Sequence, residues 1–180
     1  MSPLLDDWLP KHHIRLRHAR TSSAPPERLW QAALELRLAD TPMMRRLIHW
    51  RLGKHAPSAD TTYRELFRSG IFTLLEEGER FSVSGVAGRI WHPSGEYARF
   101  ETPADYREYA HPGTAKVVLL TEVHEHERGS EIVSESRVRV DGRRTRLLFR
   151  GFWAVVRPFS RFVPNEVLAA AVRQAEAGAG

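Results

Sequence analysis

Two glutamates and one arginine, Glu122, Glu135 and Arg137, form the polar group of this chain best suited to acid–base chemistry. They lie in two stretches that alternate between apolar and polar residues, as paired strands with one buried face do. A hairpin of these stretches places the glutamates directly opposite each other, which is unfavourable unless a cation intervenes. Arg137 on the same face could supply that positive charge.

The role of this polar group depends on which face of the sheet carries it. Inside a cavity, a buried carboxylate would have its pKa raised and could act as a general acid or base. On an outer, convex face, the same residues would form a solvated cluster of ion pairs. The pattern favours the second interpretation, because the other face of the hairpin is apolar and is the better candidate to meet a helix.

The hairpin is predicted over Lys116–His124 and Glu131–Val140, around a turn at Arg128-Gly129. If Glu127 pairs with Ser130, the apolar face pairs Val123 with Ser134, Thr121 with Ser136, Leu119 with Val138, and Val117 with Val140. A shift of one residue would mix apolar and polar side chains on both faces, which supports this alternation.

The longest apolar pattern begins after Asp141, a suitable helix N-cap, and extends to about Ala175. Its first part contains Leu147, Leu148, Phe149, Phe152, Trp153, Val155 and Val156, which we expect to form one wide stripe. Pro158 predicts a kink or a short break. The second part should turn inward through Phe162, Val163, Val167, Leu168, Ala171 and Val172.

Shorter patterns predict the elements that precede this helix. Alternation predicts a strand at His12–Arg20, and prolines at positions 25, 26 and 42 open two helices. The second of these helices should turn one side inward: Met43, Met44, Leu47, Ile48 and Leu52. Strands are predicted at Phe72–Glu76 and Arg80–Trp91. In the latter, one face is expected to carry Phe81, Val83, Ala87, Arg89 and Trp91.

These elements are predicted to form a single domain, 1–180. Residues 1–10 should be an extended N-terminal arm that docks through Leu4, Leu5, Trp8 and Leu9. Residues 176–180 are expected to be a disordered tail.

Composition limits the class of protein. The 180 residues include no cysteine, which excludes disulfides, thiolate catalysis and cysteine-ligated zinc. The net charge of +5 comes from arginines spread along the chain, so no nucleic-acid partner is expected. No apolar run approaches the ~20 residues needed to cross a bilayer. Acidic residues stand in Met1–Asp7 where a signal peptide carries lysines, so a cytoplasmic location is expected.

The nine histidines raise the question of a metal site. His12 and His13 are adjacent and would point to opposite faces of a strand. His124 and His126 could share a face, but no third ligand is evident. The chain also lacks a nucleophile elbow, a phosphate-binding glycine loop and a dinucleotide fingerprint. We therefore expect neither a metal nor a cofactor.

The order of strand, helices, strand meander and long helix resembles the START-like, SRPBCC superfamily, which includes polyketide cyclases and Bet v 1-type proteins. The start of the first helix, Ala24-Pro25-Pro26-Glu27-Arg28-Leu29-Trp30, carries much of this resemblance. A bacterial subgroup is closer still, through the segments Phe72–Leu75, Gly85–Gly95, Ser134–Val138 and Phe149–Ser160. The resemblance implies an α+β helix-grip fold, with a curved antiparallel sheet wrapped around a long C-terminal helix and a cavity between them.

Members of the superfamily bind hydrophobic small molecules or lipids in that cavity. The expected cavity residues here are Phe81, Val83, Arg89, Trp91, Leu119, Thr121, Ser136, Val138, Phe149 and Trp153. Arg89 could bind a ligand carboxylate or phosphate, or extend to solvent at the rim. Phe149 and Trp153 could line the cavity or fill it.

The expected function is non-catalytic binding of a hydrophobic or amphipathic small molecule, lipid or polyketide-like. One alternative is an enzyme resembling polyketide cyclases or dehydratases, in which polar cavity residues transfer protons. A second alternative is a protein-interaction module without a ligand, such as a homodimer formed through a sheet edge or the N-terminal arm.

Overall fold

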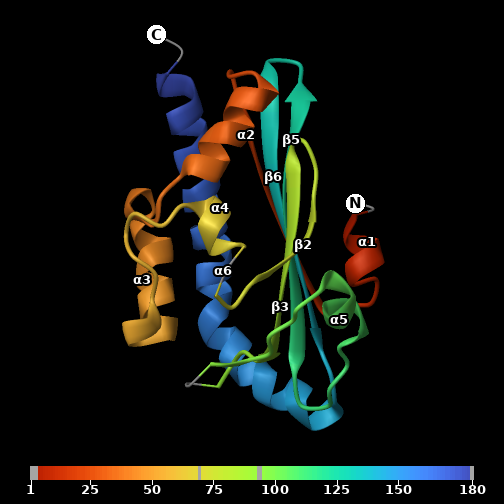
Figure 1. Ribbon diagram of the computed structural model, residues 1–180. Helices are drawn as coiled ribbons and strands as arrows, with labels where there is room; N and C mark the ends of the chain where they lie inside the picture. Colours follow the sequence, from red (N-terminus) through yellow and green to blue (C-terminus); the bar gives the residue numbers. More distant parts are fainter. Residues whose placement is uncertain (1–3, 69, 93–94, 179–180) are drawn as a thin grey trace.

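The computed structural model describes residues 4–68, 70–92 and 95–178, and shows an antiparallel sheet with helices on both sides (Figure 1). The strands are β1 (Ile14–Ser22), β2 (Thr73–Glu77), β3 (Phe81–Arg89), β4 (Glu96–Tyr97), β5 (Ala115–His126) and β6 (Gly129–Val140). They are arranged in the order β1-β6-β5-β3-β2, with β4 paired to β3. The predicted first strand therefore begins two residues later than expected, at Ile14.

The helices fall into two groups. They are α1 (Leu4–Trp8), α2 (Pro26–Glu35), α3 (Pro42–Leu52), α4 (Tyr63–Leu66), α5 (Pro103–Glu108) and α6 (Arg143–Ala177), with short 3₁₀ turns η1 (Leu38–Asp40) and η2 (Gly53–His55). Helices α1 and α5 lie on one side of the sheet, and α2, α3, α4 and α6 lie on the other (Figure 1). We call these the outer and the inner face of the sheet.

Both faces of the sheet are buried. On the inner face, Trp30 of α2 and Leu168 of α6 pack against Val123 and Ile132 of the β5–β6 hairpin. On the outer face, a second core contains Leu5, Trp8, Leu9, Leu75, Val83, Ala87, Tyr106, Val118 and Leu120. The sheet is thus not one-sided, and its central strands carry apolar residues on both sides.

The β5–β6 hairpin has the predicted faces but not the predicted register. His126 pairs with Gly129, so the two-residue turn is Glu127-Arg128. The pairs are Val123 with Ile132, Thr121 with Ser134, Leu119 with Ser136, and Val117 with Val138. Moving the turn back by one residue shifts each partner by two, which leaves every side chain on its predicted face.

Helix α6 runs without a break for 35 residues, through both Pro158 and Pro164. The predicted break at Pro158 is therefore wrong, although Figure 1 shows that the helix bends along its length. Bending is the usual response to a proline, which removes a backbone hydrogen bond and crowds the preceding turn. Gly142, and not Asp141, is the N-cap residue.

The two chain ends are more ordered than predicted over their described residues. Leu4–Trp8 is a helix and not an extended arm, and Leu5, Trp8 and Leu9 dock it on the outer face as expected. At the other end, Glu176 accepts hydrogen bonds from the Ser22 hydroxyl (3.0 Å) and the Ser23 backbone N–H (2.9 Å). These contacts contradict a disordered tail at residues 176–178, whereas residues 1–3 and 179–180 lie outside the described part.

Helix α3 differs from its prediction as well. None of its residues is buried, and Met43 is 37% exposed, although five apolar residues were expected to face inward. The helix lies against the edge of the helical layer, because its N-terminal amides at Met43 and Met44 donate to the Glu166 carboxylate of α6.

Gly85 of β3 is required by close packing on the outer face. A Cβ atom at this position would lie 2.6 Å from the ring of Tyr106, which is fully buried. The Tyr106 hydroxyl is also fixed, since it donates to the Val117 carbonyl at 2.9 Å. The ring can therefore not move aside without losing that bond.

We predict that Gly85→Ala lowers the free energy of unfolding by about 1–3 kcal/mol, as overpacking of a core does. Gly151→Ala is the matched control, because Gly151 is helical and has no atom within 4 Å of an added Cβ. It should be neutral or stabilise by up to about 1 kcal/mol. Urea denaturation measures both, and equal effects at the two positions would contradict the packing argument.

Candidate ligand-binding site

A cavity of about 130 Å³ lies between the inner face of the sheet and the second half of α6. Its apolar walls come from α2, the hairpin and α6: Trp30, Leu34, Leu119, Ile132, Val163, Val167 and Leu168. Helix α4 and the turn after it contribute Tyr63 and Phe67. The cavity is therefore enclosed by four different parts of the chain.

Small side chains explain why space remains there. Ala33 of α2 and Ala171 of α6 line the cavity from the helical side, and Ser82 and Ser134 line it from the sheet. Where larger residues stand at equivalent positions of the inner face, as Val123 and Ile132 do, the helices pack directly on the sheet.

The sheet side of the cavity carries a row of hydroxyl groups. Ser82 pairs with Thr121, and Thr121 pairs with Ser134, so three neighbouring strands each contribute one hydroxyl at the same level. Within the described part of the chain these three hydroxyls form no hydrogen bond to another residue. They can each donate to or accept from a bound molecule.

His18 continues this row on β1, where it pairs with Ser134. Its Nδ1 lies 3.4 Å from the Asn165 side-chain amide, and its buried Nε2 has no partner among the described residues. Burial lowers the pKa of His18, so the imidazole is neutral at pH 7. It is a polar neighbour of the cavity but does not line it.

Charged residues stand at one end of the cavity. Arg64, Arg68 and Glu77 are part of its lining, and Arg68 forms a bidentate ion pair with Glu77. The Arg68 and Glu77 side chains are 40% and 32% exposed, so this pair borders solvent. An amphipathic molecule could place its polar end there and its apolar part inside.

Two of the predicted cavity residues, Leu119 and Thr121, line this cavity. Ser136 follows Ser134 on the same face of β6. Phe149 and Trp153 instead line a separate open groove of about 650 Å³ at the start of α6. Trp91 and Val138 belong to the apolar cluster around Phe149, and the Trp91 ring packs edge-on against it at 5.8 Å.

Phe81 and Val83 were placed on the wrong face. They pair with Glu122 and Leu120, and Val83 is fully buried in the outer core beneath α1 and α5. Alternation could not settle this, because the more apolar side of β3 faces outward and its inner side carries Ser82 and Ser84.

Arg89 is not an inward charge. Its side chain is 55% exposed and pairs with Glu96 of β4 at 3.4 Å. The preceding Gly88 has a φ of +132°, and the β4 backbone passes close to it, so the strand pattern does not continue through this point. An anchoring role for Arg89 in the cavity is therefore excluded by its position.

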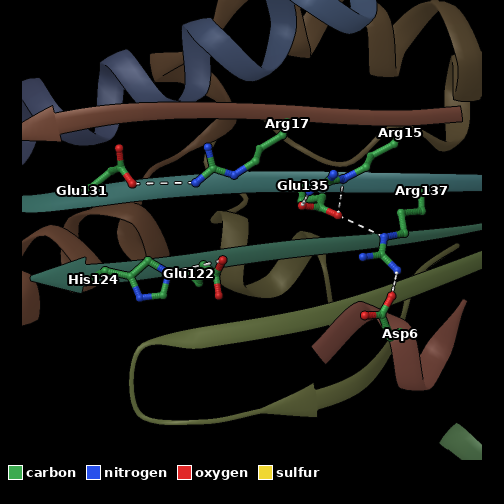
Figure 2. Close-up of polar contacts among 8 residues, drawn as sticks. All are labelled: Asp6, Arg15, Arg17, Glu122, His124, Glu131, Glu135 and Arg137. Carbon is green, nitrogen blue, oxygen red and sulfur yellow. Dashed lines mark hydrogen bonds and ion pairs between the residues drawn. The ribbon is translucent and has the colours of Figure 1, made fainter. Parts of the chain in front are cut away.

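The polar group of Glu135 and Arg137 lies on the outer face, beneath α1 (Figure 2). Arg15 donates two hydrogen bonds to Glu135, at 2.9 and 2.7 Å. Arg137 donates from Nε to Glu135 at 3.0 Å and from its terminal nitrogen to Asp6 at 2.6 Å. The chain of contacts Asp6–Arg137–Glu135–Arg15 thus links α1 to two strands.

Both interpretations of this group from the sequence were wrong. Glu135 and Arg137 are buried, so the cluster is not solvated, and it lies on the face opposite to the cavity. Burial alone would raise the pKa of Glu135, but hydrogen bonds from Arg15 and Arg137 lower it below the ordinary value of 4.5. Glu135 is therefore ionised at neutral pH and structural in this setting.

Glu122 is not part of that network. It pairs with Val133 and not with Glu135, and its carboxylate lies 3.3 Å from His124 Nε2 (Figure 2). Arg17 and Glu131 form a further, more exposed pair at 3.8 Å. The direct opposition of two glutamates does not occur.

Most cavity residues were missed as a site, although several had been assigned to the core. Trp30, Val163, Val167 and Leu168 all belonged to predicted apolar helix faces. The signal that could have located the cavity is the coincidence of small residues, Ala33 and Ala171 on helices with Ser82 and Ser134 on strands. That coincidence requires the strand order and the correct face of β3.

No helix in the described residues is both long and apolar enough to span a membrane. Likewise, no three His, Asp or Glu side chains in the described ranges come together as a metal site would require.

Comparisons with known proteins cover most of the chain but are distant. No family model matches it, and no curated protein matches it in sequence. Among solved structures it is similar to Zhui aromatase/cyclase from Streptomyces sp. R1128, at 17% identity and a TM-score of 0.39, over 93% of this chain and 98% of that one. It is similar to Ara h 8.0201 at 10% identity and a TM-score of 0.38, over 91% and 98%. The values for TTHA0849 from Thermus thermophilus are 10%, 0.37, 93% and 100%.

The class of the protein is defined by its own topology. A curved antiparallel sheet, two helices after the first strand and a 35-residue C-terminal helix across the inner face make an α+β helix-grip fold of the START-like type. The fold predicted from the sequence is thus confirmed. A fold of this kind hosts many activities, so function must be argued from the cavity.

We predict that Glu135→Gln lowers the free energy of unfolding by about 3–5 kcal/mol at pH 7, because it leaves buried Arg137 with one charged partner fewer. Since the pKa of Glu135 is lowered on folding, its contribution is present above pH 4.5 and is lost as the pH falls through the folded-state pKa. The difference between wild type and variant should therefore shrink in acid.

Glu131→Gln is the control for this experiment, because it breaks the exposed pair with Arg17 and should cost less than about 1 kcal/mol. Urea denaturation over a pH series measures both variants. A Glu135→Gln effect that is as small as the control, or that does not vary with pH, would show that the network does not hold α1 in place.

Proposed function

We propose that this protein binds a small apolar or amphipathic molecule in the cavity between the inner sheet face and α6, without changing it chemically. The observation that carries the proposal is an apolar cavity crossed by a row of hydroxyls at Ser82, Thr121 and Ser134, unpartnered among the described residues. Apolar walls supply affinity, and a few placed polar groups supply orientation, as in most small-molecule sites.

The size of the cavity limits the ligand. At about 130 Å³ it is close to the ~150 Å³ engineered apolar cavity that binds benzene. Sites for drug-sized ligands are larger, roughly 300–1,000 Å³. We therefore expect either a ligand the size of one ring, or a longer molecule that inserts one part and leaves its polar end near Arg68 and Glu77.

The lining supports binding over catalysis. Proton transfer to a cavity-bound substrate needs an acid or base within hydrogen-bond reach. Among the described lining residues the one carboxylate is Glu77, which is already paired with Arg68 at the solvent border, and there is no histidine. A cyclase-like enzyme therefore has less support than a binding protein.

We predict that Ala33→Leu weakens binding of toluene at least tenfold, because the larger side chain occupies the cavity from α2. Ala154→Leu makes the same change on an exposed turn of α6 and should leave binding unchanged. Calorimetric titration measures both affinities. Unchanged toluene binding by Ala33→Leu, with the protein still folded, would place the site elsewhere.

We predict that Thr121→Val separates the polar from the apolar contribution. Binding of benzyl alcohol should weaken by about 1 kcal/mol, the usual value of one hydrogen bond, while toluene binding stays within a factor of about two. Equal effects on the two ligands would show that the hydroxyl row does not orient the ligand.

A further inference from the structure

The first half of α6 has a second apolar side that no described residue covers. Five large apolar residues there are each between 44% and 69% exposed: Leu147, Leu148, Val155, Phe159 and Phe162. All were expected to face the core. The residues of this segment that are buried are others, Thr145, Phe149 and Val163.

Helix geometry shows that the exposed residues form one continuous face. At about 100° per residue, these five residues fall within a sector of about 120°. The buried positions Phe149 and Val163 lie on the opposite side of the helix. We call the five exposed residues the outer apolar face of α6.

A row of arginines runs along one side of this face. By the same geometry, five arginines fall within a sector of about 60° between the buried side and the outer apolar face: Arg143, Arg146, Arg150, Arg157 and Arg161. Arg144 lies within the apolar face itself. From residue 143 to residue 165 the chain contains no aspartate or glutamate.

The arginine row also borders the open groove at the start of α6. Arg143, Arg146 and Arg150 line this groove together with Phe149 and Trp153. Arg146 lies 3.2 Å from His13 Nε2. The groove thus places cationic groups beside aromatic surface, a combination that suits a phosphate group with an attached apolar chain.

We propose that the outer apolar face of α6 docks on the surface of a membrane containing anionic phospholipids. The helix would lie in the plane of the interface, with Leu148, Val155 and Phe159 among the acyl chains and the arginine row at the level of the phosphates. A large apolar face beside a strongly basic one is the pattern of helices that lie on membranes. The charge is complementary to anionic lipid.

A second copy of the chain fits this face less well. A two-fold contact presents the same surface twice, so Arg144 and the arginine row would meet their own counterparts. No acidic residue of the segment is present to neutralise them. Helix α3 adds to the basic character, because it carries three arginines, no acidic residue, and an exposed Trp50.

The test is sedimentation of the full chain with phosphatidylcholine vesicles, with and without phosphatidylserine. The wild type should bind the anionic vesicles more tightly, and added salt should weaken that binding. The double variant Leu148→Ser/Phe159→Ser should lose most of the binding. Arg150→Gln/Arg157→Gln should weaken it by about fivefold for each arginine removed.

Arg20→Gln/Arg128→Gln is the matched control, since it removes the same charge near the β5–β6 turn, at the far end of the molecule from the start of α6 (Figure 1). It should bind anionic vesicles as the wild type does. Equal loss in this control would reduce the effect to net charge and overturn the proposal. So would wild-type binding by the Leu148→Ser/Phe159→Ser variant, or absence of binding to either vesicle. A wild-type dimer in sedimentation equilibrium that this apolar variant converts to monomer would assign the face to a second copy instead.

Discussion

Both faces of the sheet must be buried, and two different sets of helices bury them. Helices α2 and α6 cover the inner face, while α1 and α5 cover the outer one. The outer cover is held by the contact of Asp6 with Arg137, and that arginine in turn is paired with Glu135 inside the sheet layer. A charged network that looked like candidate catalytic machinery is therefore the means by which a five-residue helix stays on the sheet.

The division of labour along α6 follows from the same constraint. Its second half packs on the sheet and on α2, where opposed small residues leave a cavity of about 130 Å³. Its first half turns only a narrow side, around Phe149, toward the sheet, so the remaining apolar residues stay exposed. One helix thus offers an enclosed apolar space at one end and an apolar, arginine-bordered surface at the other. If both proposals hold, a ligand could reach the cavity from the membrane on which α6 lies.

The elements were predictable because their signals are local. Alternation and three-to-four-residue spacing gave the strands, the main helices and the faces of the hairpin without knowledge of the partner elements. The face of β3 was not predictable, because Phe81 and Val83 mark a buried side whichever helices cover it. The cavity was predicted in kind from the resemblance, and only Leu119 and Thr121 of the ten proposed residues line it. Its position depends on where small residues from distant elements meet.

The most direct measurement is a methyl NMR titration of the wild-type protein with p-xylene. Methyl groups of Leu119, Ile132 and Val167 report on the cavity, those of Leu5 and Val83 on the outer core, and those of Leu148 and Val155 on the exposed side of α6. The account predicts saturable shifts at the first group and none at the second or third. Shifts centred on either other group, or none at all, would contradict a ligand site between the sheet and α6.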